Sequence, residues 1–585
     1  MTAQAPPREL SELEQAIVAR ITRPDYRRFE AQLRSSGYCA RPVRLRGSVQ
    51  VCDGHGARRQ VWSTDGEPDE LLRKACGNRR EAICGPCAAV YRADAWQLVA
   101  AGLRGGKGVP ETVTGHPAVF ATLTAPSFGA VHAHVLGPDG QPVRCRPRRD
   151  APVCPHGNPL GCSKIHGPDD PCLGEPLCAQ CFDYDGAVIW NSLLGELWRR
   201  TMIYLPRKLA KLTQMTQKRL HELVSVSYAK VSEYQHRGLV HLHPVIRLDR
   251  RMPTYRKSEI RAPDKRFTTG LLEQALRDAV ADVKTNVPDE LGDGDVRWGT
   301  RLDVQQLSSD EEPRRQRASY LAKYSTKSTE QAGGLLYRVT AEDVEHVKVR
   351  PHVRNYMRSV HKLHAKVSKA IAAAAPAESM SPPAPAPAPT TSEQPNGVIL
   401  RVLAAMSTSE RVLIRLHDAS AHVGCVVRRS NGGLVLDDET AIQLAEVRAI
   451  TTPQPATKRD RRDRRLAQCA HAFGYRGHCL TKSRHYSTTF GQLRQDRADH
   501  IRQQLLARGD AAQRTLAQVD PSERITDFEF VGVGHLTSAD AVLAAQAAAR
   551  AREDRELARE ALYDHHNRGR EGRCEAPQDQ TGVGL

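Results

Sequence analysis

The uneven distribution of cysteines is the feature that most constrains the fold. Eleven of the fifteen cysteines lie before residue 182 in a chain of 585 residues. So large a chain, with no recognisable signal peptide, does not resemble the small secreted proteins in which dense cysteines form disulfides. Cysteines at CxxC spacing in polar, Gly- and Pro-rich sequence favour structural zinc instead. We therefore expect metal ligands to organise much of the first third of the chain.

One predicted zinc site lies near residue 80. Cys84 and Cys87 have CxxC-type spacing, and Cys76 precedes them closely. A tetrahedral site needs a fourth ligand, for which Cys52 is favoured by its proximity in sequence. The alternative is a set of reduced, buried cysteines without a metal.

A second predicted zinc site uses the CxxC pair Cys178 and Cys181. Its segment, residues 140–186, is rich in Pro, Gly, Cys and His and shows almost no hydrophobic periodicity, as in a segment organised by ligands. Several residues compete for the two remaining positions, among which we select Cys154 and Cys162. The competing residues are Cys145, Cys154, His156, Cys162 and His166.

The charge of the chain favours a polyanionic partner. Lys and Arg number 85 against 67 for Asp and Glu, a formal net charge of +18. Nucleic acid fits this excess better than a membrane surface, because no run of 18 or more apolar residues occurs. We expect a cytoplasmic protein that does not bind a membrane. No GxxxxGK[ST] motif is present, so the chain is not expected to be a P-loop motor.

The length predicts several modules in place of one core. The Pro- and Ala-rich stretch 372–397 reads as a linker, and short alternating segments after it indicate a small β module. The predicted divisions are an N-terminal cysteine-containing module (1–110), a core (111–335) with the insertion 140–186, a helical extension (336–371), the linker (372–397), the β module (398–452), a basic C-terminal region ending in a helix (458–566) and a tail (567–585).

The core is expected to contain a buried strand and a β-hairpin. Val119–Thr124 is short, apolar and followed by Ala-Pro, as a buried strand would be. Val224–Tyr228 and Leu239–Leu248 alternate on either side of a break. Gly238 at positive φ would suit a three-residue hairpin loop.

The sharpest chemical pattern is the pair His241 and His243 on the second strand of this hairpin. Residues i and i+2 of a strand share one face, so both imidazoles can bind one ion. A three-residue loop would place Glu233 opposite His241 as a third ligand, whereas a two-residue loop would place Tyr234 there.

A second pair with the same spacing, His132 and His134, follows the strand Val119–Thr124 closely. It lacks a preceding hairpin turn. We therefore expect no comparable role for this pair.

A predicted helix carries two tyrosines and two lysines, each pair four residues apart. Ser309 and Glu312 resemble a capping box that would start this helix, which would run to about residue 327. The residues on it are Tyr320, Lys323, Tyr324 and Lys327. An ammonium beside a phenol can favour the phenolate and neutralise a phosphate oxygen, although an ordinary amphipathic helix would show the same spacing.

These patterns together resemble a known family. The buried strand followed by Ala-Pro, then His241-Leu242-His243, then Tyr320 to Lys327 match in order and type the three motifs of HUH rolling-circle initiators. More narrowly, the chain resembles the RepSA-like replication initiators of actinobacterial plasmids and integrative conjugative elements. The likeness extends to the cysteine pairs and to residues 473–489. Only the linker and the 398–452 module look additional.

The resemblance implies an α+β fold, with an antiparallel sheet flanked by helices as the HUH core. It implies that Tyr324 attacks the scissile phosphate and that Tyr320 acts in the second transesterification, with Lys323 and Lys327 beside them. Mg²⁺ or Mn²⁺ would be held by His241, His243 and Glu233.

The implied partners are double-stranded origin DNA, single-stranded DNA, a host helicase and other replication proteins. The basic segment after residue 473 would contact DNA through Arg476, Lys482 and Arg484. Two alternatives stay open. A conjugative relaxase or HUH transposase would use the same chemistry, and a non-catalytic zinc-containing DNA-binding regulator would use none of it.

Overall fold

A computed structural model of the whole chain describes residues 10–52, 58–150, 152–374, 466–509, 511–520 and 523–571, together with the strands between 411 and 451. The chain divides into two compact units. The first contains Met1–Asn286, Asp295–Leu336 and Gly477–Leu585, and the second contains Val287–Gly294 and Tyr337–Arg476.

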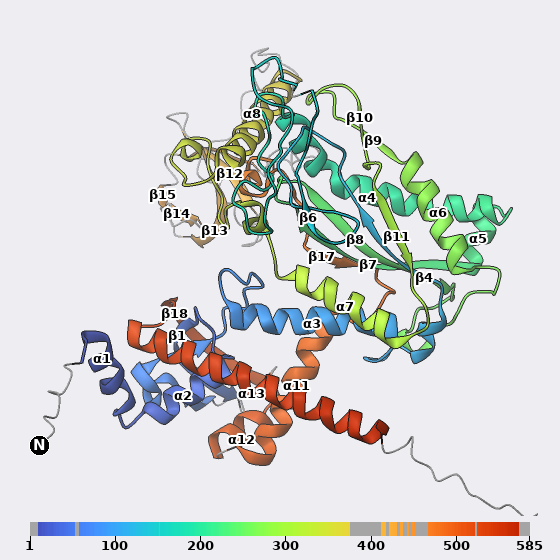
Figure 1. Cartoon of the computed structure of the whole chain (residues 1–585). Coiled ribbons are helices and arrows are strands. Elements are labelled where there is room, and N and C mark those ends of the chain that lie inside the picture. Colours follow the sequence, from blue (N-terminus) through green and yellow to red (C-terminus); the bar gives the residue numbers. More distant parts are fainter. Residues whose placement is uncertain are drawn as a thin grey trace, which may run out of the picture. The chain divides into compact units, whose positions relative to one another are not determined.

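The first unit is built on a five-stranded antiparallel sheet (Figure 1). Its strand order is β11 (Leu302–Gln306), β4 (Ala118–Leu123), β8 (Val240–Arg250), β7 (Val224–Tyr234) and β17 (Leu480–Lys482). The predicted buried strand and hairpin are confirmed as β4 and as β7 with β8. The edge strand β17 was not predicted, because three residues are too few for a recognisable alternation.

Helices cover both faces of this sheet, so the predicted α+β class is confirmed (Figure 1). α4 (Tyr184–Leu212) and α6 (Thr269–Asp282) pack together on one face. α3 (Gly85–Arg104) and α7 (Glu311–Ser325) lie side by side on the other. The core beneath α3 and α7 includes Leu98, Phe120, Val231, Val245 and Leu321.

Helix α7 starts differently from the prediction. Its N-cap is Asp310, whose side chain makes no capping hydrogen bond. The carboxylate of Glu312 accepts a hydrogen bond from the Arg315 guanidinium at 2.8 Å. The predicted capping box of Ser309 and Glu312 is therefore wrong, because an ion pair one turn along the helix occupies Glu312.

A second antiparallel sheet joins the two ends of the first unit. It consists of β18 (Arg524–Val533), β1 (Val43–Cys52), β2 (Arg58–Ser63) and β3 (Leu72–Lys74). The helices of these end segments are α1 (Glu12–Ile21), α2 (Tyr26–Ser35) and α13 (Ser538–Glu571). Phe29 and Leu33 of α2 pack against Leu543 of α13. The N-terminal and C-terminal segments thus share a core that sequence patterns did not predict.

The first unit contains further short elements. These are β5 (Val135–Leu136), β6 (Pro142–Val143), α5 (Gln217–Leu223), β9 (Lys284–Asn286), β10 (Asp295–Arg297), α11 (Phe490–Arg508) and α12 (Ala511–Gln518). Among the described residues between 124 and 184, β5 and β6 are the paired strands, and isolated bridges supply the rest of the pairing.

The second unit contains a long helix and a sheet. α8 (Pro351–Ala374) buries Tyr356, whose ring lies 5.0 Å from that of Phe473. The antiparallel sheet has the order β15 (Ala441–Gln443), β14 (Gly433–Leu436), β13 (Ala421–Arg429), β12 (Arg411–Leu416) and β16 (Val447–Thr451). These strands fall within the predicted β module. From residue 375 on, the predicted linker lies outside the described residues.

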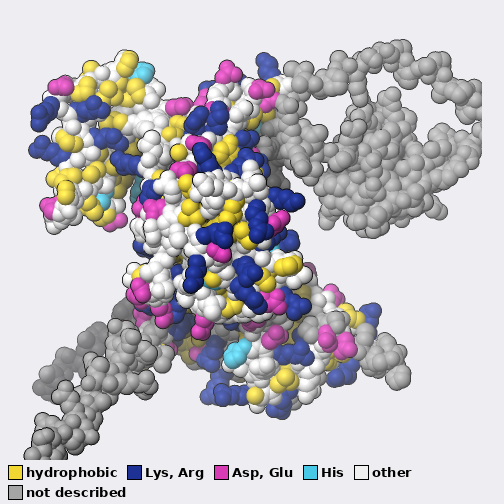
Figure 2. All heavy atoms as spheres, turned by 90° about the vertical axis from the view of Figure 1, so that its right-hand side faces the viewer, with side chains coloured by type: hydrophobic (Ala, Val, Ile, Leu, Met, Phe, Trp, Pro, Cys, Tyr) yellow, Lys and Arg dark blue, Asp and Glu magenta, His cyan; other side chains and the backbone are white. Residues whose placement is uncertain are grey.

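Basic side chains are spread over the surface. Figure 2 shows lysines and arginines across the face that it draws, with acidic and apolar side chains between them. This distribution accords with the net charge of +18. Among the helices that the structure describes, none has the length and apolar character needed to cross a membrane.

Gly102 in α3 allows a close approach between that helix and Tyr486. A Cβ on Gly102 would lie 2.2 Å from the Tyr486 ring, which is fully buried. Gly102→Ala should therefore lower the apparent melting temperature, although alanine is the better helix former by roughly 1 kcal/mol. Gly195→Ala in α4, where a Cβ meets open space, should raise it. Thermal unfolding followed by circular dichroism measures both, and stabilisation by Gly102→Ala would refute the packing described.

Candidate active site and metal centres

The β7–β8 hairpin has the register that brings three metal-ligand side chains to one face. Gly238 ends a three-residue loop with φ of +81°, and its N–H donates to the Gln235 carbonyl at 2.9 Å. Glu233 consequently pairs with His241, as predicted for this loop length, and Tyr234 pairs with Val240.

The two histidines differ in their surroundings. His243 is 4% exposed, and its ring nitrogens lie 2.7 Å from the Glu233 carboxylate and 3.2 Å from the Thr122 hydroxyl. Nε2 of His241 is buried and has no hydrogen-bond partner within the described residues. Burial lowers the pKa of His241 to about 3, so the ring is neutral near pH 7 and can donate a lone pair to a cation.

Helix α7 places both tyrosines against this face. The Tyr320 hydroxyl donates to the Glu233 carboxylate at 3.3 Å, and its ring lies 5.3 Å from that of His243. Tyr324 lies one turn further along, with its ring 4.7 Å from that of Tyr320. Glu233 thus contacts the hairpin histidine and the tyrosine helix at once.

Burial and the Glu233 carboxylate raise the pKa of both Tyr320 and Tyr324. Lys323 and Lys327 lie over the Tyr324 ring at 5.8 and 5.2 Å from its centroid. The lowering of a phenol pKa that neighbouring lysines could produce is therefore not seen, because burial and the Glu233 carboxylate raise the pKa of Tyr324. Positive charge that offsets Glu233 would favour the phenolate.

A cavity of about 880 Å³ opens beside these residues. Glu233, His241, Tyr324 and Lys327 line it, and Tyr320 does not. The segment between β4 and α4 also lines it, with residues that include His132, His134, Arg146 and Gly174. Of the two tyrosines on α7, Tyr324 is therefore the one that faces a space large enough for a nucleotide.

The residues present fit a divalent cation. Two imidazoles and one carboxylate are a common ligand set for such an ion. Nε2 of His241 has no hydrogen-bond partner within the described residues, so its lone pair is available to bind a cation. Their ligand atoms are not among the groups gathered within 4.8 Å of one another in the described part of the chain. Glu233 instead hydrogen-bonds to His243, so an ion would replace that contact.

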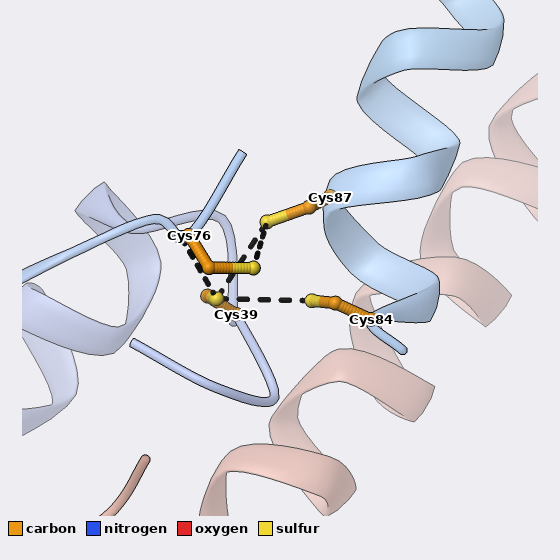
Figure 3. A group of neighbouring side chains, drawn as sticks. All are labelled: Cys39, Cys76, Cys84 and Cys87. Atoms are coloured by element: carbon orange, nitrogen blue, oxygen red, sulfur yellow. Dashed lines mark hydrogen bonds between the residues drawn. The ribbon is translucent and has the colours of Figure 1, made fainter. Parts of the chain in front are cut away.

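Four cysteines gather where α3 begins (Figure 3). Cys39 Sγ lies 3.7 Å from that of Cys84 and 3.6 Å from that of Cys87, and Cys76 Sγ lies 3.7 Å from that of Cys87. A tetrahedron with Zn–S bonds near 2.3 Å has sulfur separations of about 3.8 Å. This group can hold a metal ion such as zinc.

Cys39, and not Cys52, completes this group. Cys52 ends strand β1, where its backbone pairs with Arg58 across a hairpin. Proximity in sequence misled the prediction, because the turn after helix α2 brings residue 39 to Cys76 across 37 positions. The Cys76 N–H donates to Cys39 Sγ at 3.3 Å, and the hydrogen bond from Cys87 lowers the pKa of Cys39.

The loop held by these cysteines contacts the end of helix α7. The Arg79 guanidinium donates to the carbonyls of Ser325 and Lys327 at 3.3 and 3.4 Å, and the Glu81 N–H donates to that of Thr326 at 3.3 Å. These carbonyls belong to the turn that follows Tyr324. Arg79 lies between Cys76 and Cys84 in the sequence, and the spacing of the cysteines alone did not predict this contact.

A second group with closely spaced ligand atoms consists of Cys154, His156, Cys178 and Cys181. The Nδ1 atom of His156 lies 3.3 to 3.9 Å from the three sulfurs. His156 therefore occupies the position predicted for Cys162. Cys162 lies elsewhere, because its strand bridge with Arg146 directs it to another group of the insertion.

That other group joins Cys162 to His132, Cys145 and His166. His132 was set aside in the sequence because no hairpin turn precedes it. The backbone N–H of His132 donates to the Glu175 carbonyl at 2.8 Å, across 43 positions. Because this pairing joins distant parts of the segment, a local sequence pattern could not predict which residues lie beside His132.

The three basic residues predicted to bind DNA have different environments. Arg484 is exposed and Arg476, in the second unit, is half-buried. Lys482 donates to the carbonyls of Ser483, Arg484 and Ser487 at 3.2 to 3.4 Å, and burial lowers its pKa to about 8. Backbone oxygens thus occupy the Lys482 ammonium, and DNA binding by Lys482, Arg476 and Arg484 stays a prediction.

Comparison with known proteins agrees with the resemblance. The family model described as "Replication initiator protein, pSAM2" (RepSA) matches residues 25–382 and 425–549. A replication initiator protein of Streptomyces ambofaciens is 32% identical over 554 residues, covering 92% of this chain and 94% of that protein. No solved structure matches significantly.

The family match also corrects one expectation about the β module. The unmatched stretch between the two matched segments is 383–424, so the family model resumes at residue 425, inside the module. The module was expected to be wholly additional, because its weak alternation resembles no motif quoted for the family. The extent of the match and the identity along nearly the whole chain show that this protein belongs to the RepSA family of replication initiator proteins.

Proposed function

We propose that this replication initiator nicks one strand of a plasmid origin by tyrosine transesterification, within an HUH-type core, and later rejoins that strand. Its substrates are duplex origin DNA and the single strand exposed there. Strand separation is assigned to a host helicase, because the sequence holds no P-loop motif.

One observation carries this proposal: Glu233 lies between the paired histidines and the tyrosine helix. Its carboxylate contacts His243 at 2.7 Å and Tyr320 at 3.3 Å, and His241 lies opposite it in the hairpin. A divalent cation held by these three ligands, Mg²⁺ or Mn²⁺, would polarise a scissile phosphate beside the phenols. A purely structural cluster would not need both tyrosines beside the one carboxylate.

Tyr324 is the proposed first nucleophile because it lines the cavity and Tyr320 does not. Its oxygen forms a bond to phosphorus while the bond to the 3′ oxygen of the upstream nucleotide breaks. The products are a 3′ hydroxyl and a 5′-phosphotyrosine link, which conserves one phosphodiester and requires no ATP. Lys323 and Lys327, near the Tyr324 ring, supply positive charge to the phosphate oxygens.

The tyrosines are predicted to divide the reaction. Tyr324→Phe should abolish the covalent adduct with labelled single-stranded origin DNA in Mn²⁺, because no other phenol of the pair faces the cavity. Tyr320→Phe should form the adduct but leave nicked or multimeric plasmid. Denaturing gels measure the adduct as protein that carries the labelled DNA. An adduct that survives Tyr324→Phe and disappears in Tyr320→Phe would reverse the assignment, and no adduct with the wild-type chain would favour a non-catalytic regulator.

The two histidines are predicted to be required for nicking but not for binding to duplex DNA. His241→Ala or His243→Ala should reduce nicking of supercoiled origin plasmid by at least ~100-fold, because each removes a ligand of the cation. Duplex binding in a mobility-shift assay should stay close to wild type, since basic side chains elsewhere supply it. His221→Ala on the exposed side of α5 is the matched control. Equal loss of nicking and binding would contradict the proposal.

Arg79 is predicted to position the nucleophile from the cysteine-held loop. Arg79→Ala should slow adduct formation about tenfold, because the turn after Tyr324 loses its hydrogen bonds and the phenol is less well placed. Zinc content, measured by mass spectrometry, should not change. Arg92→Ala, which removes a half-buried arginine paired with Glu81 at 3.7 Å, is the control. Wild-type adduct rates in Arg79→Ala would exclude this positioning role.

A further inference from the structure

The segment between β4 and α4 contains a four-residue group that the sequence did not predict as one site. His132, Cys145, Cys162 and His166 bring their ligand atoms within 4.8 Å of one another. Cys162 Sγ lies 3.4 Å from Nε2 of His166, and the rings of His132 and His166 are 5.1 Å apart. Tetrahedral zinc with Zn–S near 2.3 Å and Zn–N near 2.0 Å would separate sulfur from nitrogen by about 3.6 Å.

We propose that His132, Cys145, Cys162 and His166 bind one Zn²⁺ as a Cys₂His₂ site, separate from the Cys39 and Cys154 groups. The three groups use different residues, so each can be occupied independently. This proposal does not depend on the proposed nicking reaction, because it concerns metal content alone.

The hydrogen bonds of His166 favour this ligand set over a competing one. Asp170 and Cys172 also lie near His166, but they face its other nitrogen: Nδ1 is 2.8 Å from the Asp170 carboxylate and 3.4 Å from Cys172 Sγ. Nε2 of His166 lies on the side of Cys162, where both can bind the metal. A carboxylate that accepts a hydrogen bond from the far nitrogen of a metal-bound histidine is the usual outer partner of such a ligand.

The other two ligands are also prepared for a metal. The Ala133 N–H donates to Cys145 Sγ at 3.2 Å, a contact that stabilises a thiolate. Nδ1 of His132 is buried and has no hydrogen-bond partner within the described residues. An unpaired buried imidazole nitrogen is costly, and a bound cation would remove that cost.

The site lies in the wall of the cavity that faces Tyr324. His132 and Arg146, which follows the ligand Cys145, both line that cavity. The backbone of Gly174 donates to the His132 carbonyl at 2.9 Å, and a Cβ on Gly174 would lie 2.2 Å from the carbonyl carbon of His236 in the hairpin loop. The ion would therefore fix the wall that rests on the active-site hairpin.

The test is the zinc content of the full chain by native mass spectrometry. Cys162→Ser should contain one ion fewer than the wild type, and Cys172→Ser, which alters the competing thiol, should contain the same number. Asp170→Asn keeps all four ligands, and it should lose one ion to a competing chelator at a chelator concentration about 10- to 100-fold lower than the wild type.

An unchanged count in Cys162→Ser, or the loss of an ion from Cys172→Ser, would overturn the proposal. If Cys162→Ser does not fold, the test rests on Asp170→Asn. The proposal would also be overturned if Asp170→Asn kept every ion up to the chelator concentration at which the wild type loses one. None of these readouts involves DNA, so a chain that fails to nick can still confirm the site.

Discussion

The contact between His243 and Glu233 across the β7–β8 hairpin is the interaction on which the proposed active site depends. It requires the register set by the three-residue loop, in which Gly238 takes a left-handed conformation at φ +81°. A shift of one residue would turn one partner to the opposite face of the sheet. The same carboxylate accepts a hydrogen bond from Tyr320. The hairpin register therefore also determines which face of α7 packs against the histidines.

Helix α7 is held in place at both ends by arginines that bond to backbone carbonyls. Near its start, Arg314 is 1% exposed and donates to the carbonyls of Leu103 and Thr114 at 3.0 and 2.7 Å. At its end, Arg79 from the cysteine-held loop bonds to the turn after Tyr324. These bonds hold both ends of the helix, so the proposed nucleophile Tyr324 would be positioned before substrate arrives. Metal in the cysteine group would add to that rigidity from outside the active site.

Local patterns predicted the parts of the fold and site whose residues are close in sequence. The hairpin and the pairing of Glu233 with His241 follow from alternation and loop length, and strand β4 follows from a short apolar run. Contacts between distant segments could not be predicted in this way. Cys39 joins Cys76 only because of the turn after α2, and strand β17 is too short to show alternation. The phenol pKa values depend on burial and on a carboxylate from another element, neither of which the lysine spacing reveals.

Identification of the amino acid that carries DNA tests the central claim most directly. The full chain would be incubated with single-stranded origin DNA and Mn²⁺, digested with protease and nuclease, and analysed by tandem mass spectrometry. The account predicts one modified peptide, with the nucleotide on the Tyr324 oxygen through its 5′ phosphate. A nucleotide attached to a residue outside helix α7, or through its 3′ phosphate, would contradict it.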